Sequence, residues 1–177
     1  PPGAPPGHPD LYDRWGRDIG EDTGTTHIAI VDGWGNAVSL TATVESLFGS
    51  QRMTNGFFLN NQLTDFSFTP TLNGRPVANA VAPGKRPRSS MTPVIVTDRD
   101  GDLELVIGSP GGSSIITYTA RTTIGILDWN LPVQDAINVG NATARTETVA
   151  AEITRMPAGI AEALTAHDAL ASHARDE

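Results

Sequence analysis

The sequence predicts an α+β fold, in which antiparallel strands pack against helices. Alternation of apolar residues predicts one hairpin with strands at 27–31 and 37–43, and a second with strands at 93–97 and 103–108. Helical periodicity follows at 114–128, and shorter helices are expected at 133–138 and 157–170. Strand pairs that precede a group of helices are typical of α+β proteins.

Turn-forming residues separate these elements. The segments Asp32-Gly33-Trp34-Gly35-Asn36 and Asp98-Arg99-Asp100-Gly101 predict the two hairpin turns. A short strand is expected at 57–59, and residues 66–88 are rich in turn formers, which predicts a long ordered loop. The helix at 114–128 is expected to bury one stripe, made of Ile115, Ile116, Ala120, Thr123, Ile124 and Leu127.

The composition limits the class of protein. The chain has 177 residues, 38% of them hydrophobic, which is enough for one globular domain with a core. The net charge of −8, with no basic cluster longer than Lys85-Arg86-Pro87-Arg88, argues against a nucleic-acid partner. No apolar run is long enough to span a bilayer, and no signal-peptide pattern opens the sequence. Cysteine is absent and no His, Asp or Glu cluster has metal-binding spacing, so no metal site is expected.

A Gly24–Thr25 bond opens the first predicted strand, and a chain can cut itself at such a bond. Cleavage would make Thr25 an N-terminal residue that carries both a nucleophile, its Oγ, and a base, its own α-amine. The ordinary pKa of an α-amine is about 7.7 to 8, so it can accept a proton near neutral pH. Thr43 ends the partner strand, where the antiparallel return brings its hydroxyl near Thr25. The alternative is that both are ordinary strand threonines.

The segment Ser109-Pro110-Gly111-Gly112-Ser113 lies between a predicted strand and a predicted helix. Gly111 and Gly112 can point successive backbone N–H groups into one hollow, as in an oxyanion hole. A glycine-rich connector that ends in a serine helix cap is the alternative.

Polar residues at several strand ends suggest a site for an amino-acid head group. Glu45, Gln62 and Asp65 offer two carboxylates and an amide for an ammonium group, whereas Ser89 and Ser90 offer hydroxyls for a carboxylate. On the residues alone, the favoured interpretation is that they are solvated loop ends. His27, on the same strand face as Thr25, is expected to have a structural role.

Four segments in order carry a resemblance to one family: TTHIAIVDGWGNAVSLTATVESLFGS, LNNQLTDF, KRPRSSMTP and GSPGGSSII. From Thr25 to about Leu170 the chain resembles the small, C-terminal subunit of γ-glutamyltranspeptidase (γ-glutamyltransferase), an N-terminal-nucleophile hydrolase. The resemblance implies the αββα sandwich of that class, here as a partial domain. It also implies that residues 1–24 are the tail of the large subunit, and that residues 25–177 are the small-subunit catalytic region, truncated at its C-terminus.

The resemblance implies a role for each candidate residue. Thr25 is the nucleophile, released when the zymogen cuts its own Gly24–Thr25 bond, and Thr43 hydrogen-bonds the nucleophile's hydroxyl. Gly111 and Gly112 form the oxyanion hole. The implied substrate contacts are Glu45, Gln62 and Asp65 for the α-amino group, and Ser89 and Ser90 for the α-carboxylate.

The implied activity is γ-glutamyl transfer or hydrolysis, without any cofactor. Donors are of the glutathione type, and acceptors are water, amino acids or peptides. The implied partner is the large subunit of the same precursor, in a heterodimer that is periplasmic or extracellular. Two alternatives remain open: a related amidase acting on cephalosporin or glutaryl side chains or on poly-γ-glutamate, and an inactive fragment that lacks its large subunit. The full set of amino-acid contacts favours a γ-glutamyl group, while the missing large subunit predicts that this chain alone is inactive.

Overall fold

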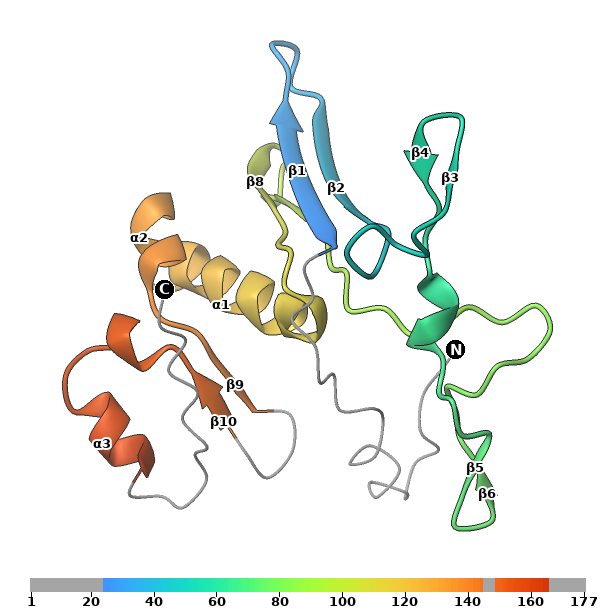
Figure 1. Ribbon diagram of the computed structural model, residues 1–177. Coiled ribbons are helices and arrows are strands. Elements are labelled where there is room, and N and C mark those ends of the chain that lie inside the picture. The colour runs from blue at the N-terminus through green and yellow to red at the C-terminus, as the bar shows by residue number, and fades with distance from the viewer. Residues whose placement is uncertain (1–23, 145–148, 166–177) are drawn as a thin grey trace. The chain divides into compact units, whose positions relative to one another are not determined.

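The computed structural model describes residues 24–144 and 149–165 (Figure 1). The chain divides into two compact units, an N-terminal unit of residues 1–113 and a C-terminal unit of residues 114–177. Each unit is described by itself. The expected large-subunit tail at 1–24 lies outside the described residues, apart from Gly24.

The first predicted hairpin is confirmed. Strands β1 (Thr25–Val31) and β2 (Ala37–Thr43) pair antiparallel in continuous register, and β1 begins two residues earlier than expected. At the turn, the Asp32 carboxylate accepts hydrogen bonds at 2.9 Å from the backbone N–H groups of Trp34 and Asn36, and at 2.7 Å from the Asn36 amide. These hydrogen bonds, the Asn36 side chain first, lower the pKa of Asp32.

The second predicted hairpin is also confirmed. Strands β7 (Val94–Thr97) and β8 (Leu103–Ile107) pair antiparallel, with a register shift between Val96 and Thr97. The Ser39 hydroxyl of β2 donates a hydrogen bond of 3.0 Å to the Ile107 carbonyl of β8, so the two hairpins are joined. This junction brings the end of β8 next to the strand pair that begins at Thr25.

The chain between the two large hairpins contains two small ones. Strand β3 (Met53–Thr54) pairs with β4 (Phe57–Phe58), which lies within the strand expected at 57–59. A 3-10 helix, η2 (Gln62–Asp65), follows, and the expected long loop contains the short pair β5 (Thr71–Leu72) and β6 (Arg75–Pro76). Phe66 and Val77 are buried, so this loop has its own small apolar core.

The C-terminal unit contains the predicted helices. Helices α1 (Ile115–Leu127) and α2 (Val133–Asn138) match the expected segments, and α3 (Ile160–Thr165) covers the middle of the third. Residues 166–170 of that expected helix lie outside the described residues. The antiparallel pair β9 (Ala142–Ala144) and β10 (Val149–Ala151), and the 3-10 helix η4 (Ile153–Arg155), were not expected from the sequence.

The prediction of which α1 side chains are buried is wrong at most positions. Ile115 is buried, but Ile116, Ile124 and Leu127 are exposed, and the other buried residues of the helix are Thr119, Thr122 and Gly125. The reason is contact with α2, since a Cβ at Gly125 would lie 3.2 Å from the Cβ of Ala136. Close approach of two helices requires small residues at the contact, whatever the hydrophobicity of their neighbours.

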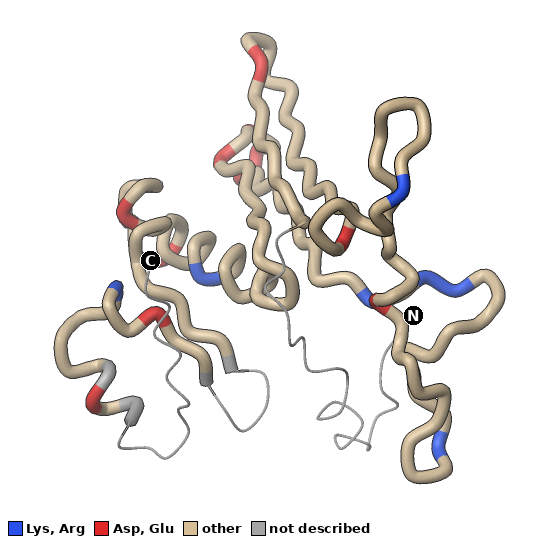
Figure 2. Tube along the Cα trace, viewed as in Figure 1, with Lys and Arg blue, Asp and Glu red and all other residues tan. Residues whose placement is uncertain are grey.

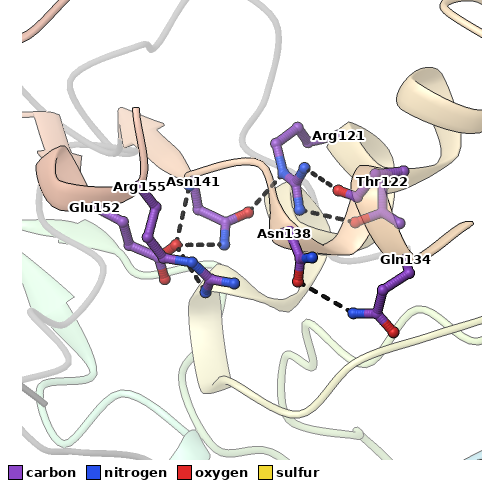
Figure 3. A network of polar contacts seen from close by, with 8 residues as sticks. Arg121, Thr122, Gln134, Asn138, Asn141, Glu152 and Arg155 are labelled. Carbon is purple, nitrogen blue, oxygen red and sulfur yellow. Dashed lines mark hydrogen bonds and ion pairs between the residues drawn. The ribbon is translucent and has the colours of Figure 1, made fainter. Parts of the chain in front are cut away.

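A polar network centred on Arg121 holds the C-terminal unit together (Figure 3). The Arg121 guanidinium donates to the Asn141 side-chain oxygen at 2.7 Å, to the Ala136 carbonyl at 2.5 Å and to the Thr122 hydroxyl at 3.0 Å. The Asn141 amide donates in turn to the Glu152 carboxylate at 3.0 Å. Burial lowers the pKa of Arg121, a shift that Glu152 opposes and Arg155 reinforces. The network therefore ties α1 to the end of α2 and to the segment that follows β10.

Replacing Arg121 with methionine is expected to lower the free energy of unfolding by about 1–3 kcal/mol. The change leaves the side-chain oxygen of Asn141 and the carbonyl of Ala136 without the hydrogen bonds that Arg121 donates. The matched control is Arg155→Ala, which removes an ion pair of 3.5 Å between Glu152 and a more exposed arginine. That change is expected to cost less than about 1 kcal/mol. Urea unfolding of the whole protein measures both variants, and equal losses would contradict this account of the network.

Lys and Arg form no long run along the described part of the chain. Figure 2 shows Lys and Arg as single positions or short stretches interspersed with Asp and Glu. Among residues 24–144 and 149–165, no helix has the length and apolar character needed to cross a bilayer.

Candidate active site

The site begins where β1 and β2 meet at their open end. The register places Thr25 directly opposite Thr43, as the antiparallel return of the hairpin predicts. The Thr25 hydroxyl donates a hydrogen bond of 3.1 Å to the Thr43 hydroxyl, which donates one of 3.2 Å to the Gly24 carbonyl. Thr43 Oγ1 also accepts the backbone N–H of Glu45 at 2.8 Å. One hydroxyl therefore contacts both the nucleophile candidate and the carbonyl of the bond expected to be cut.

Gly24 fits only because it has no side chain. A Cβ at this position would overlap the Glu45 carbonyl oxygen and lie 3.1 Å from the Ser46 carbonyl oxygen. Glu45 itself has a φ of 75°, in the left-handed region that side chains rarely adopt. This turn of the backbone directs the Glu45 N–H to Thr43 and its carbonyl to Gly24, so it fixes the geometry around the Gly24–Thr25 bond.

His27 lies against the glycine-rich segment that follows β8. The imidazole Nδ1 lies 2.9 Å from the Thr41 hydroxyl, and a Cβ at Gly108 would overlap the ring. Nε2 is buried and has no hydrogen-bond partner among the described residues. Burial lowers the pKa of His27, so the ring is neutral around pH 7. This packing agrees with the structural role expected of His27.

Replacing Gly108 with alanine is expected to destabilise the protein by about 1–3 kcal/mol, because a methyl group would overlap the His27 ring. His27→Ala opens the space that the methyl group needs. The double variant is therefore expected to be less destabilised than the sum of the two single variants. Urea unfolding of the four proteins measures this coupling, and simple additivity would mean that the two residues do not compete for space.

The glycine pair Gly111–Gly112 lies three residues beyond the His27 contact. Both glycines have positive φ, 127° and 54°, which only glycine adopts readily in succession. The Gly112 carbonyl accepts a hydrogen bond of 2.6 Å from the Ser90 hydroxyl. A 3-10 helix, η3 (Gly112–Ser114), starts there. Ser90 and Gly112, expected to serve different ends of a substrate, are thus in direct contact.

The remaining candidates form two polar groups. The Glu45 carboxylate accepts hydrogen bonds from Ser46 at 2.6 Å, from Thr64 at 3.2 Å and from the Asn61 amide. In η2, the Gln62 amide donates to the Asp65 carboxylate. Ser89 is exposed and its hydroxyl accepts the Met91 N–H at 3.2 Å.

Two residues near these groups were not singled out from the sequence. Asn61 contacts Glu45, and its backbone N–H donates to the Val44 carbonyl at 3.2 Å. Asn79 is buried between the segments that carry Asp65 and Ser89. The polar stretch Asn60-Asn61-Gln62 was a signal for Asn61, and a single amide within the apolar run Val77-Ala78-Asn79-Ala80-Val81 was a signal for Asn79.

The chemistry available is that of hydroxyls, amides and carboxylates. The described part of the chain holds no group of three or more His, Asp and Glu residues that is placed to bind a metal ion. A hydroxyl donating to a second hydroxyl, which donates to a peptide carbonyl, provides a path for proton movement during attack on that carbonyl.

Comparison with known proteins gives consistent matches. The sequence matches the γ-glutamyltranspeptidase family over residues 4–176. It is 44% identical to the glutathione hydrolase proenzyme of Pseudomonas sp. (strain A14) over 125 residues, which cover 67% of this chain and 22% of that protein. For the glutathione hydrolase proenzyme of Escherichia coli (strain K12), the identity is 44% over 127 residues, 67% of this chain and 21% of that protein. The chain thus spans about a fifth of the length of these relatives.

Solved structures agree with the sequence matches. A highly active mutant of γ-glutamyltranspeptidase from Pseudomonas nitroreducens superposes with a TM-score of 0.73 at 36% identity, covering 85% of this chain and 82% of that chain. The Bacillus anthracis transpeptidase CapD gives a TM-score of 0.62 at 30% identity, covering 84% and 77%. These neighbours have the N-terminal-nucleophile hydrolase fold, which confirms the expected fold class. The chain belongs to the γ-glutamyltranspeptidase family.

Proposed function

We propose that this chain supplies the small-subunit catalytic region of an enzyme that transfers or hydrolyses γ-glutamyl groups. Thr25 is the nucleophile, and it is released by cleavage of the Gly24–Thr25 bond. The observation that carries this proposal is the Thr43 hydroxyl, which contacts Thr25 Oγ1 at 3.1 Å and the Gly24 carbonyl at 3.2 Å. The names of the relatives support it, since both proteins from Pseudomonas sp. and E. coli are glutathione hydrolase proenzymes.

Cleavage follows from the hydrogen-bond order. Thr25 Oγ attacks the Gly24 carbonyl carbon, while its proton passes to Thr43 Oγ and the Thr43 proton passes to the carbonyl oxygen. The intermediate collapses when its hydroxyl loses its proton, the C–N bond breaks and the nitrogen takes up that proton, which leaves an ester between Gly24 and Thr25 Oγ. Water hydrolyses this ester to a Gly24 carboxylate and a free Thr25 with its α-amine.

Turnover uses the same hydroxyl. Thr25 Oγ attacks the γ-carbonyl of the donor and its α-amine takes the proton, while the N–H groups of Gly111 and Gly112 stabilise the oxyanion. The α-ammonium then protonates the leaving amine, and a γ-glutamyl ester remains on Thr25. Water or an acceptor amine breaks this ester and restores the free hydroxyl, without a cofactor.

The donor's amino-acid head explains the remaining polar residues. Glu45, Gln62 and Asp65 bind the α-ammonium group, and Ser89 and Ser90 bind the α-carboxylate. The pairing of Gln62 with Asp65 supports this, because a carboxylate oriented by an amide is prepared to accept from an ammonium group.

An exposed apolar face supports a partner from the same precursor. The outward side of the β1–β2 hairpin presents Ile28, Ile30, Val38 and Leu40, each 43% to 53% exposed, whereas its half-buried side carries Thr25, His27 and Thr43. Large apolar patches mark interaction sites. We propose that the large subunit covers this face in a heterodimer. By family membership, we place the enzyme in the periplasm or outside the cell.

The alternatives differ in their substrates. The higher similarity to the P. nitroreducens γ-glutamyltranspeptidase, with a TM-score of 0.73 against 0.62 for the transpeptidase CapD, supports γ-glutamyl transfer. A glutaryl acylase has no use for contacts to an α-amino group, because the glutaryl group carries none. The third alternative, an inactive fragment, applies to the isolated chain, which we expect to lack turnover without its large subunit.

The test compares two chromogenic anilides as substrates of the heterodimer that contains this chain and its large subunit. They are γ-glutamyl-p-nitroanilide and its glutaryl analogue, which lacks the α-amino group. The proposal predicts a kcat/KM for the γ-glutamyl compound at least about 100-fold higher, because polar groups built for an ammonium are left unpaired by the analogue. Preference for the glutaryl compound would instead establish an acylase. Turnover of neither compound by the cleaved heterodimer of this chain and its large subunit would refute the proposal.

A further inference from the structure

Asn79 is a buried amide that joins two segments of the candidate site. Its side chain is 4% exposed overall, within the loop that has Phe66 and Val77 as its apolar core. The amide nitrogen donates to the Asp65 carbonyl at 2.6 Å, and the amide oxygen accepts the Arg88 N–H at 3.0 Å. These two partners fix the orientation of the amide, because a carbonyl needs a donor and an N–H needs an acceptor.

The two joined segments carry opposite ends of the proposed head-group site. Asp65 ends η2 (Gln62–Asp65), whose side chains are proposed to bind the α-ammonium group. Arg88 immediately precedes Ser89 and Ser90, which are proposed to bind the α-carboxylate. One side chain therefore links the two binding segments.

Backbone contacts reinforce this junction. The Asn79 carbonyl accepts the Ser67 N–H at 2.9 Å, two residues beyond Asp65. Lys85 closes the other side, since its ammonium group donates to the Ala80 carbonyl at 2.9 Å and to the Ala78 carbonyl. The carbonyls on either side of Asn79 are thus held by one cation, and the loop is closed around the amide.

Packing alone does not account for this amide. A leucine of similar size could fill the volume, but it would remove the hydrogen bonds to the Asp65 carbonyl and the Arg88 N–H. Only a side chain with a donor and an acceptor at a fixed spacing can tie a carbonyl to an N–H. The buried amide of Asn79 is therefore suited to holding the Asp65 carbonyl and the Arg88 N–H at a fixed separation.

We propose that Asn79 is a positioning residue that sets the spacing between the α-ammonium and α-carboxylate contacts and so determines the preference for γ-glutamyl donors. This inference rests on the proposed function. It does not assign Asn79 any contact with the substrate. The substrate class it selects is an acyl group that carries a free α-amino acid head, as opposed to a plain dicarboxylic acyl group.

The experiment measures kcat and KM of the cleaved heterodimer, which contains this chain and its large subunit, for γ-glutamyl-p-nitroanilide and glutaryl-p-nitroanilide. Asn79→Asp keeps the acceptor for the Arg88 N–H but places an oxygen against the Asp65 carbonyl, and Asn79→Leu removes both hydrogen bonds. We expect the kcat/KM ratio of γ-glutamyl to glutaryl to fall by about 10- to 100-fold in both variants, mainly through KM, because small displacements of binding groups have effects of this size.

The matched control is Asn141→Leu. Asn141 is also a buried amide with one accepted and one donated side-chain hydrogen bond, to Arg121 and Glu152, but it lies in the C-terminal unit. The Asn141→Leu variant is expected to be less stable, with no change in the ratio of kcat/KM for the γ-glutamyl anilide to that for the glutaryl anilide. Lys85→Met provides a second route, because it loosens the same loop from a less buried position and is expected to lower the ratio in the same direction.

The possible outcomes distinguish failure of the proposed function from failure of the positioning role of Asn79. A wild-type protein that does not favour the γ-glutamyl compound refutes the proposed function itself. A wild-type protein that favours it, with an unchanged ratio in the Asn79 variants, refutes the positioning role alone. If the Asn79 variants do not fold, Lys85→Met decides, and an unchanged ratio in that variant overturns the inference.

Discussion

Replacing Thr25 with alanine is expected to abolish both cleavage of the Gly24–Thr25 bond and γ-glutamyl turnover. The variant loses the Oγ that attacks both carbonyls, and it also keeps the α-nitrogen within a peptide bond. Loss of a nucleophile costs about 10³-fold or more in rate, so turnover of a γ-glutamyl anilide is expected to fall to the background. The measurement is the initial rate of anilide release beside the wild-type protein.

Thr25→Ser provides the control. Serine retains Oγ and the hydrogen bond to Thr43, so it is expected to cleave and to turn over, at a reduced rate. An alanine variant with wild-type turnover would mean that the nucleophile lies elsewhere.

Replacing Thr43 with valine is expected to slow cleavage and turnover by about 10²- to 10³-fold, the usual effect of losing one donor that stabilises a developing oxyanion. Valine keeps the shape of threonine but removes the hydroxyl that accepts a hydrogen bond from Thr25 and donates one to the Gly24 carbonyl. It also leaves the Glu45 N–H without this acceptor. The time course of cleavage, followed by gel electrophoresis, gives the rate.

Thr43→Ser tests the hydroxyl separately from the shape. It retains the oxygen, and its cleavage rate is expected to stay within about ten-fold of wild type, a difference of about 1.4 kcal/mol in the barrier. If the valine variant cleaved as fast as the serine variant, the proposed proton transfer through the Thr43 hydroxyl would be wrong.

The large hairpins could be predicted because local chemistry determines them. Asp32 and Asp98 each accept backbone N–H groups of their own turn, so the turn position and the strand register follow from a few adjacent residues. Once the turn after Val31 is set, the register alone places Thr43 opposite Thr25. That part of the candidate site was therefore accessible from the sequence.

Other features depend on contacts that periodicity does not encode. The pairs β3–β4, β5–β6 and β9–β10 have two or three residues per strand, too few for an alternating pattern. In α1, the buried side is decided by the approach of Ala136 to Gly125, and the isoleucines on the other side gave the stronger sequence signal. Asn79 acts through residues 14 positions before and 9 positions after it, and such pairings are not visible in the sequence.

The most direct test of the central claim is the N-terminal sequence and intact mass of the whole protein after purification and prolonged incubation. The account predicts a new N-terminus that reads Thr-Thr-His-Ile-Ala, with a matching mass for the piece that begins at Thr25, and an uncut chain for Thr25→Ala. An uncut wild-type chain that still turns over γ-glutamyl anilide, or cleavage at any other bond, would contradict the assignment of Thr25 as the released nucleophile.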